Sequence, residues 1–206
     1  MASDTFGFLV DQNTLIAVIL GAILATIGGF VATATERYLD KRERERNAAL
    51  FFGELLSTMS LILAFARSAR SIGDPYGPIT MRFLRATRRE IDIYDRNRES
   101  LFDLRHHELR ARIHTTMLRL TMPLDGIFDA SREIAEALAS LKNGSLATDA
   151  LRRDAEDRLE ELRTSRNSTF DFILETDTNV RTLIKDLEPL ARHSFEKTDK
   201  AVRSAV

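Results

Sequence analysis

The sequence predicts an all-α protein, in which a single N-terminal transmembrane helix continues into an elongated antiparallel helical bundle, or coiled-coil-like domain. No charged side chain occurs between Asp11 and Glu36, and apolar residues recur at steps of three and four through most of the remaining chain. Only four prolines and nine glycines occur among 206 residues, and so few helix breakers suit long helices. Beyond the apolar segment, enough chain remains for about one domain.

The first apolar segment, residues 12–35, is the predicted transmembrane helix, and residues 1–11 form a short extracytoplasmic tail. Roughly 20 apolar residues, at about 1.5 Å each, cross a hydrocarbon core of about 30 Å. The core helix of a soluble protein is a competing interpretation, but uncharged runs longer than about 18 residues are rare there. A signal peptide fits poorly, because residues 1–11 lack the basic region with which such peptides begin.

Basic residues crowd only one flank of the predicted span. No Lys or Arg precedes it, whereas five follow it: Arg37, Lys41, Arg42, Arg44 and Arg46. The positive-inside rule counts Lys and Arg near a span, so we expect the N-terminus outside and the C-terminal domain in the cytoplasm. The excess of arginine over lysine and the anchor-plus-bundle layout resemble bacterial inner-membrane proteins in layout only. They favour a single-pass protein of the cell inner membrane.

Small residues recur along one side of the predicted span. The members of this small-residue face are Ala17, Gly21, Ala25, Gly28, Gly29, Ala32 and Thr33. Such residues let helix backbones approach closely within lipid, so the face predicts packing against another copy or a different membrane protein, besides contact with membrane lipid. The abundance of alanine and glycine in membrane spans also produces this spacing by chance, and both interpretations stay open.

The predicted cytoplasmic bundle covers residues 36–192 and is followed by a frayed tail at 193–206. Its helices are expected at about 36–72, 80–98, 105–143 and 149–192. Gly73, Pro75, Gly77 and Pro78 oppose a continuing helix and predict the first reversal of direction. In the second helix, Leu84, Thr87, Ile91 and Tyr94 form the expected apolar stripe, and residues 101–104 form a connector.

The third and fourth predicted helices carry long apolar stripes and should pack antiparallel. The third stripe keeps its steps of three and four through Pro123, which predicts a kink rather than an end. Asn143 and Gly144 are expected to close the third helix, and Thr148 to cap the fourth. The stripe of the fourth helix is interrupted at Arg166.

A second apolar run, residues 48–66, raises the possibility of a second span, which would reverse the topology. Glu54 interrupts this run, and a carboxylate in the middle of a membrane helix costs several kcal/mol. A buried helix of the bundle explains the run better.

The remaining chemistry argues against an enzyme. Cysteine is absent, and no phosphate-binding loop, dinucleotide fingerprint, nucleophile elbow or HExxH zinc motif occurs. Asp103, His107 and His114 share a helical face and are the best candidate metal ligands, but the paired Glu-x-x-His motifs of di-metal bundles are missing. We therefore expect no cofactor, no metal and no small-molecule substrate.

Six arginines surround the first predicted hairpin, with Asp74 as the only acid among them: Arg67, Arg70, Arg82, Arg85, Arg88 and Arg89. The start of the fourth helix is instead acidic, so ion pairing within the chain is the favoured interpretation. Docking to an acidic partner is the alternative. No nucleic acid is expected, because the net charge is -1 and no aromatic residues are interleaved for stacking on bases.

Two functional hypotheses follow from this layout. The first is a non-enzymatic, membrane-anchored scaffold or accessory subunit that acts through helix–helix interactions in the bilayer and through its cytoplasmic bundle. The second is a single-span signalling or sensing element that transmits a conformational change from the membrane to the bundle. Inserting one residue near Arg46 would disturb a sensor but not a passive tether.

Overall fold

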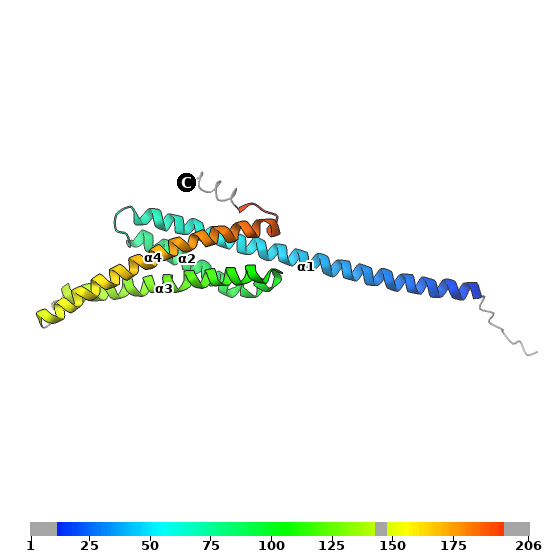
Figure 1. The fold of residues 1–206 in the computed structure, drawn as a ribbon, viewed down its shortest axis with the longest axis horizontal. Helices are drawn as coiled ribbons and strands as arrows, with labels where there is room; N and C mark the ends of the chain where they lie inside the picture. Colours follow the sequence, from blue (N-terminus) through cyan, green and yellow to red (C-terminus); the bar gives the residue numbers. More distant parts are fainter. Residues whose placement is uncertain (1–11, 143–147, 196–206) are drawn as a thin grey trace, which may run out of the picture. The chain divides into compact units, whose positions relative to one another are not determined.

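The computed structural model describes residues 12–142 and 148–195, with side chains from residue 19 onward. Regular structure in these ranges is helical throughout (Figure 1). The elements are α1 (Gln12–Arg70), α2 (Pro78–Arg96), the short 3-10 helix η1 (Arg98–Asp103), α3 (His107–Lys142) and α4 (Asp149–Ala191). The chain divides into two compact units, residues 1–43 and 44–206.

The first unit contains the N-terminal part of α1, in which every described side chain from residue 19 to residue 43 is exposed. The exposed large apolar side chains include Ile23, Leu24, Ile27, Phe30 and Val31, and Phe30 is 76% exposed. Among the described helices, α1 is the one that is long enough and apolar enough, by length and composition, to cross a membrane. A contiguous exposed apolar surface of this kind is typical of a region that contacts lipid or another protein.

The main apolar core of the second unit contains residues of all four α-helices and Leu101 of η1, and a smaller apolar cluster contains Ile134 of α3 with Leu159 and Leu162 of α4. From α1 come Phe52, Leu56, Met59 and Leu63, all 0–1% exposed. The apolar run at 48–66 therefore lies in the core of the bundle, as the sequence favours. Glu54 remains on the exposed side of the helix, where its charge stays solvated.

The first reversal of direction lies where the glycines and prolines predict it. Gly73 has a φ of 86°, a left-handed conformation that suits glycine. The second helix starts at Pro78, slightly before the expected residue 80, because a proline in the first turn of a helix needs no backbone donor. The expected stripe of Leu84, Thr87, Ile91 and Tyr94 is buried.

The expected connector at residues 101–104 overlaps a 3-10 helix, η1, which begins at Arg98. Leu101 and Leu104 are 6% and 0% exposed, so burial of these two leucines accounts for an ordered turn where the sequence suggested only a link. Arg105, which follows Leu104, is bound to α1: its backbone N–H donates to Oε1 of Glu45 at 3.1 Å.

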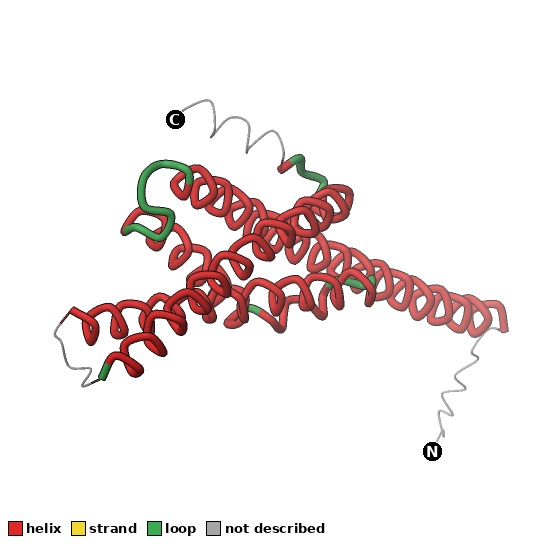
Figure 2. The backbone as a smooth tube through the Cα atoms, turned by 60° about the vertical axis from the view of Figure 1, so that its left-hand side comes forward, coloured by secondary structure: helices red, strands yellow, loops and turns green. Residues whose placement is uncertain are grey.

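Helices α3 and α4 lie side by side and antiparallel, as predicted (Figure 2). Helix α3 continues through Pro123, so this proline does not end it. Thr148 caps α4, since its hydroxyl oxygen accepts the N–H of Leu151 at 3.4 Å. The predicted stop at Asn143 and Gly144 lies outside the described residues.

The C-terminal end of the bundle departs from the predicted fraying at residue 193. Arg192 adopts a left-handed conformation with a φ of 53°, which turns the chain after α4. Phe195 is then 2% exposed, and its N–H donates to Oε1 of Glu188 at 2.9 Å. A Cβ atom built on Gly53 would overlap Cζ of Phe195, so Phe195 fits against α1 because residue 53 is a glycine. Residues 196–206 of the predicted tail lie outside the described residues.

We predict that Gly53→Ala lowers the free energy of unfolding, by about 1–2 kcal/mol, because the new methyl group displaces the buried Phe195 ring. Gly126→Ala in α3 is the matched control, since nothing lies within 4 Å of the added Cβ there. The control should stabilise the protein by up to about 1 kcal/mol through helix propensity. Denaturant unfolding of the full chain in detergent, followed by circular dichroism, measures both, and a stabilising Gly53→Ala would contradict the packing.

Candidate functional site

Two of the six arginines around the α1–α2 hairpin pair with carboxylates of other helices. Arg70 contacts Asp171 of α4 at 2.7 Å through Nη1. Arg88 contacts Asp125 of α3 at 3.0 Å through Nε, and it also pairs with Asp92 one turn further along α2. The hairpin is thus tied to α3 and α4 by ion pairs that are partly exposed, which are worth at most about 1 kcal/mol each.

The other four arginines, which we call the arginine face, are Arg67, Arg82, Arg85 and Arg89. All four are exposed, and within residues 12–142 and 148–195 none has an ion pair or hydrogen bond. The three members in α2 are spaced by three and four residues, opposite the buried stripe, and therefore share one side of the helix. The arrangement is an exposed basic surface that no acid among the described residues neutralises.

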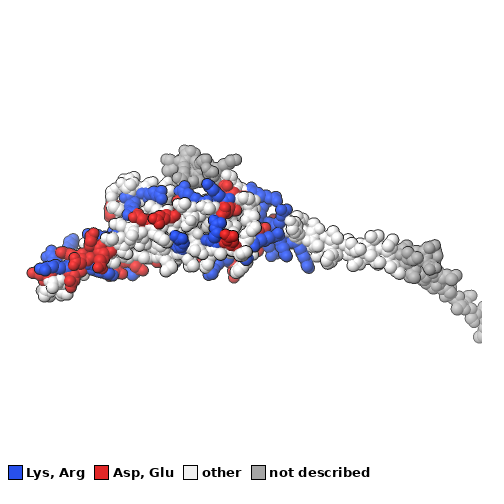
Figure 3. Space-filling model, in the orientation of Figure 1, with Lys and Arg blue, Asp and Glu red and all other residues white. Residues whose placement is uncertain are grey.

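The acidic residues at the start of α4 do not supply the missing partners. Glu156 pairs with Arg152, Glu161 with Arg158 and Glu160 with Arg163, each within one turn of the same helix. Figure 3 shows acidic and basic side chains intermixed over this end of the α3–α4 hairpin. The charge asymmetry seen in the sequence is therefore resolved locally at the α3–α4 end, whereas the arginine face remains open.

The interruption of the α4 stripe at Arg166 is explained by Tyr76, which lies in the α1–α2 turn. The Cζ atom of Arg166 lies 3.7 Å from the centre of the Tyr76 ring, a cation–π contact. Nη1 of Arg166 reaches Ser131 of α3 at 3.4 Å, but its buried Nε atom has no partner among the described residues. Burial lowers the pKa of Arg166. Sequence reasoning missed this cluster, whose only signal was a charge in an apolar stripe.

The hydroxyl group of Tyr76 extends this contact to α4. It lies 3.0 Å from the carbonyl oxygen of Arg166 and 2.9 Å from Oδ1 of Asn167, and these two acceptors share its single proton. Burial raises the pKa of Tyr76, and the nearby positive charges of Arg70 and Arg166 offset only part of that rise. The neutral phenol is therefore the stable form in the folded protein.

His114, one of the three candidate metal ligands, forms hydrogen bonds with Tyr94 and Arg98. Its Nδ1 atom lies 2.9 Å from the Tyr94 hydroxyl, and its Nε2 atom lies 3.3 Å from Nη2 of Arg98. Because arginine can only donate, Nε2 accepts and the ring proton is on Nδ1, from which it donates to Tyr94. His107 and Asp103 are exposed, and the described residues contain no group of three His, Asp or Glu side chains that would hold a metal ion.

The small-residue face lies on the exposed part of α1. Gly21, Gly28 and Gly29 have nothing within 4 Å of a built Cβ, and Ala25 and Ala32 are exposed. The hydroxyl group of Thr33 donates to the carbonyl oxygen of Gly29 at 2.9 Å, so the helix itself satisfies the one polar group of the face. The side chain of Ala17 lies outside those described. The described part of the face is therefore shallow, apolar and open to a partner.

We predict that the free energy of unfolding declines as the pH rises above about 10. Burial raises the folded-state pKa of both Tyr76 and Tyr94 above the ordinary value of 10.0, so the unfolded chain ionises first and is stabilised. Below that pH both states are protonated and these groups contribute no pH dependence. Denaturant unfolding at pH 8–11 measures the slope, which Tyr76→Phe should reduce; an unchanged slope would contradict the burial of that phenol.

Comparisons with protein-family models, with curated proteins and with solved structures find no match for this chain. The described residues present two surfaces open to a partner, the arginine face and the small-residue face. Both consist of exposed side chains on regular helices, and neither brings together a nucleophile, a base and an orienting group in a cavity. Such surfaces suit binding of a partner.

Proposed function

We propose that this protein is a non-enzymatic scaffold or accessory subunit, anchored in the cell inner membrane by one span with its helical bundle in the cytoplasm. The observation that carries the proposal is the exposure of every described side chain from residue 19 to residue 43, a segment free of charge up to Glu36. Lipid satisfies this apolar surface, and the basic residues from Arg37 onward support a cytoplasmic bundle.

The small-residue face gives the anchor a second role. Inside lipid, helices gain no hydrophobic energy from association, so close van der Waals contact between backbones becomes the main attraction. Gly21, Ala25 and Gly29 lie one turn apart and leave the backbone open to such contact. We infer that this face packs against a membrane-protein partner or a second copy of the chain.

We predict that replacing Gly21, Ala25 and Gly29 with leucine weakens association in the membrane, because three isobutyl groups keep the partner backbone away. The measurement is the set of membrane proteins that co-purify after crosslinking in intact membranes. The matched control replaces Ile23, Ile27 and Ala34 with leucine on the opposite side of α1, where association should persist. Equal recovery of partners with both variants would remove the role assigned to the small-residue face.

The arginine face supports docking of an acidic protein segment to the bundle. Its arginines carry positive charge that no acid of the described chain neutralises, and guanidinium groups bind carboxylates through paired hydrogen bonds. Stacking on nucleic-acid bases lacks support, since the aromatic ring nearest in sequence, Phe83, packs against the core. The proposed partner is therefore a protein rather than DNA or RNA.

We predict that changing Arg82, Arg85 and Arg89 to glutamate abolishes recovery of such an acidic partner, while the helical content of the bundle is preserved because all three side chains are exposed. Recovery with the unchanged protein should fall as salt is raised, since the contact is between exposed charges. A control with the same change of charge replaces Arg132, Arg152 and Arg153 at the outer end of the α3–α4 hairpin. Loss of the partner in both variants would indicate a non-specific charge effect and contradict docking at the arginine face.

One observation favours the second candidate, a sensing element. Helix α1 runs from Gln12 to Arg70 without a break, so one helix carries both the exposed apolar segment and residues of the bundle core. A continuous helix transmits rotation and translation along its axis. A one-residue insertion near Arg46 rotates one part by about 100° relative to the other. The insertion separates this candidate from a tether, which would tolerate it.

A further inference from the structure

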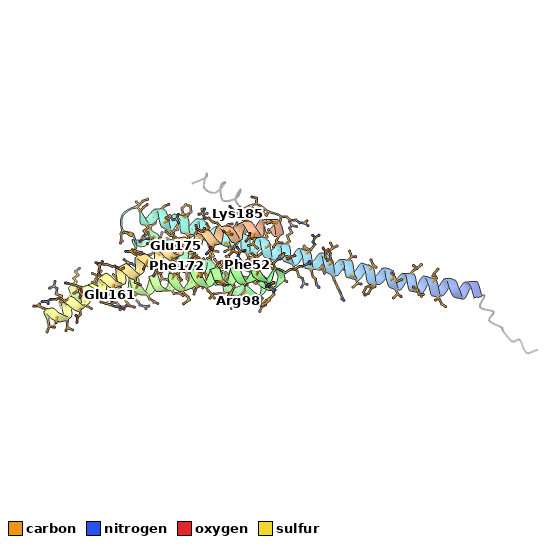
Figure 4. All side chains as sticks on the ribbon, in the orientation of Figure 1. Phe52, Arg98, Glu161, Phe172, Glu175 and Lys185 are labelled. Carbon is orange, nitrogen blue, oxygen red and sulfur yellow. The ribbon has the colours of Figure 1, made fainter. Side chains whose placement is uncertain are left out.

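A cavity of about 450 Å³ lies between α1 and the C-terminal part of α4. Its lining consists of Ser57 and Ser60 from α1, of Arg181, Ile184, Lys185 and Glu188 from α4, and of Phe195 after the end of α4. Figure 4 shows Lys185 on this part of α4. The volume falls within the range of sites that bind small molecules, and neither the scaffold role nor the two surfaces above make use of it.

The α1 wall of the cavity offers two hydroxyl groups without partners. Ser60 is 6% exposed, and neither Ser60 nor Ser57 makes a hydrogen bond with any residue of the described ranges. Other hydroxyls in the same bundle behave differently: those of Thr176 and Thr182 each donate to the carbonyl oxygen four residues earlier. Ser57 is half-buried, and both serines line the cavity, so their hydroxyl groups remain available to a ligand there.

The α4 wall presents two cations one turn apart. Nε of Arg181 donates to Oδ2 of the buried Asp177 at 2.9 Å, which orients the guanidinium group and leaves its terminal nitrogens without a partner in the described chain. Lys185 has no ion pair within the same residues. Five donor groups, counting both terminal nitrogens of Arg181, thus border one cavity, and such a set suits an anion with several acceptor oxygens.

The rest of the lining consists of Glu188 and of two apolar side chains that are held in place. Ile184 lines the cavity beside Phe195, whose ring is fixed against Gly53 and whose N–H is bound by Glu188. An inorganic ion would leave this part of the cavity unused. We propose that the cavity binds a small organic anion, with a carboxylate or phosphate group held by Arg181, Lys185 and the two serines and an apolar body against Ile184 and Phe195.

The test uses two fluorinated probes, 4-fluorobenzoate and 4-fluorophenyl phosphate, with the full chain in detergent and fluorine NMR as the readout. At least one probe should show saturable line broadening that empty micelles do not produce, and the two probes distinguish a carboxylate from a phosphate ligand. The neutral analogue 4-fluorobenzamide should not bind, because it cannot pair with Lys185. Absence of saturable binding of both anions up to about 10 mM would overturn the proposal.

Variants assign the binding to this cavity. Lys185→Gln should weaken the anion by about tenfold or more, and Ser60→Ala by several-fold. Ser60→Ala removes a hydroxyl that has no partner, so it should fold with an unchanged melting temperature. The matched controls are Lys142→Gln at the end of α3 and Thr182→Ala, whose hydroxyl is already bound within α4. Unchanged affinity in Lys185→Gln, or equal losses in the controls, would place any binding elsewhere and overturn the assignment.

Discussion

The bundle depends on the apolar face that α1 buries between Ala48 and Ala66. Phe52, Leu56 and Met59 are all fully buried there. Burying each such side chain contributes about 1.5–3 kcal/mol, which is a large share of the net stability of a domain this size. The same helix carries the exposed apolar segment nearer its N-terminus, so the proposed anchor and the core belong to one continuous element. Loss of α1 would remove both.

The second constraint is the contact between the α1–α2 turn and α4. Tyr76 brings its ring against Arg166 and its hydroxyl group against the α4 backbone, while Arg70 reaches Asp171 in the next turn of α4. A half-buried guanidinium group without a carboxylate is costly, and the aromatic face and the Ser131 hydroxyl offset only part of that cost. The cluster therefore favours one specific position of the α1–α2 turn against α4, whereas a purely apolar contact would allow many positions.

The distribution of charge separates the proposed binding surfaces from the surfaces whose charges pair within the bundle. Where acids and bases are interleaved, as at the start of α4, they pair within one turn and leave little net charge. Where the bases make no ion pair within the described residues, as on the arginine face and at Lys185, the positive charge remains available to a partner. Exposed pairs contribute little to stability, so the unpaired arginines carry more functional information than the paired ones.

The helices, their order and most of the core could be predicted from the sequence, because helical periodicity and turn residues are local properties of the chain. The stripe in α2, the passage of α3 through Pro123 and the cap at Thr148 all follow from residues within a few positions of each other. The long-range contacts could be seen only in the folded chain: Arg70 pairs with Asp171, Phe195 packs on Gly53, and the serines of α1 line the same cavity as the cations of α4. These contacts join residues about 100 positions apart or more, and packing geometry rather than local pattern selects them.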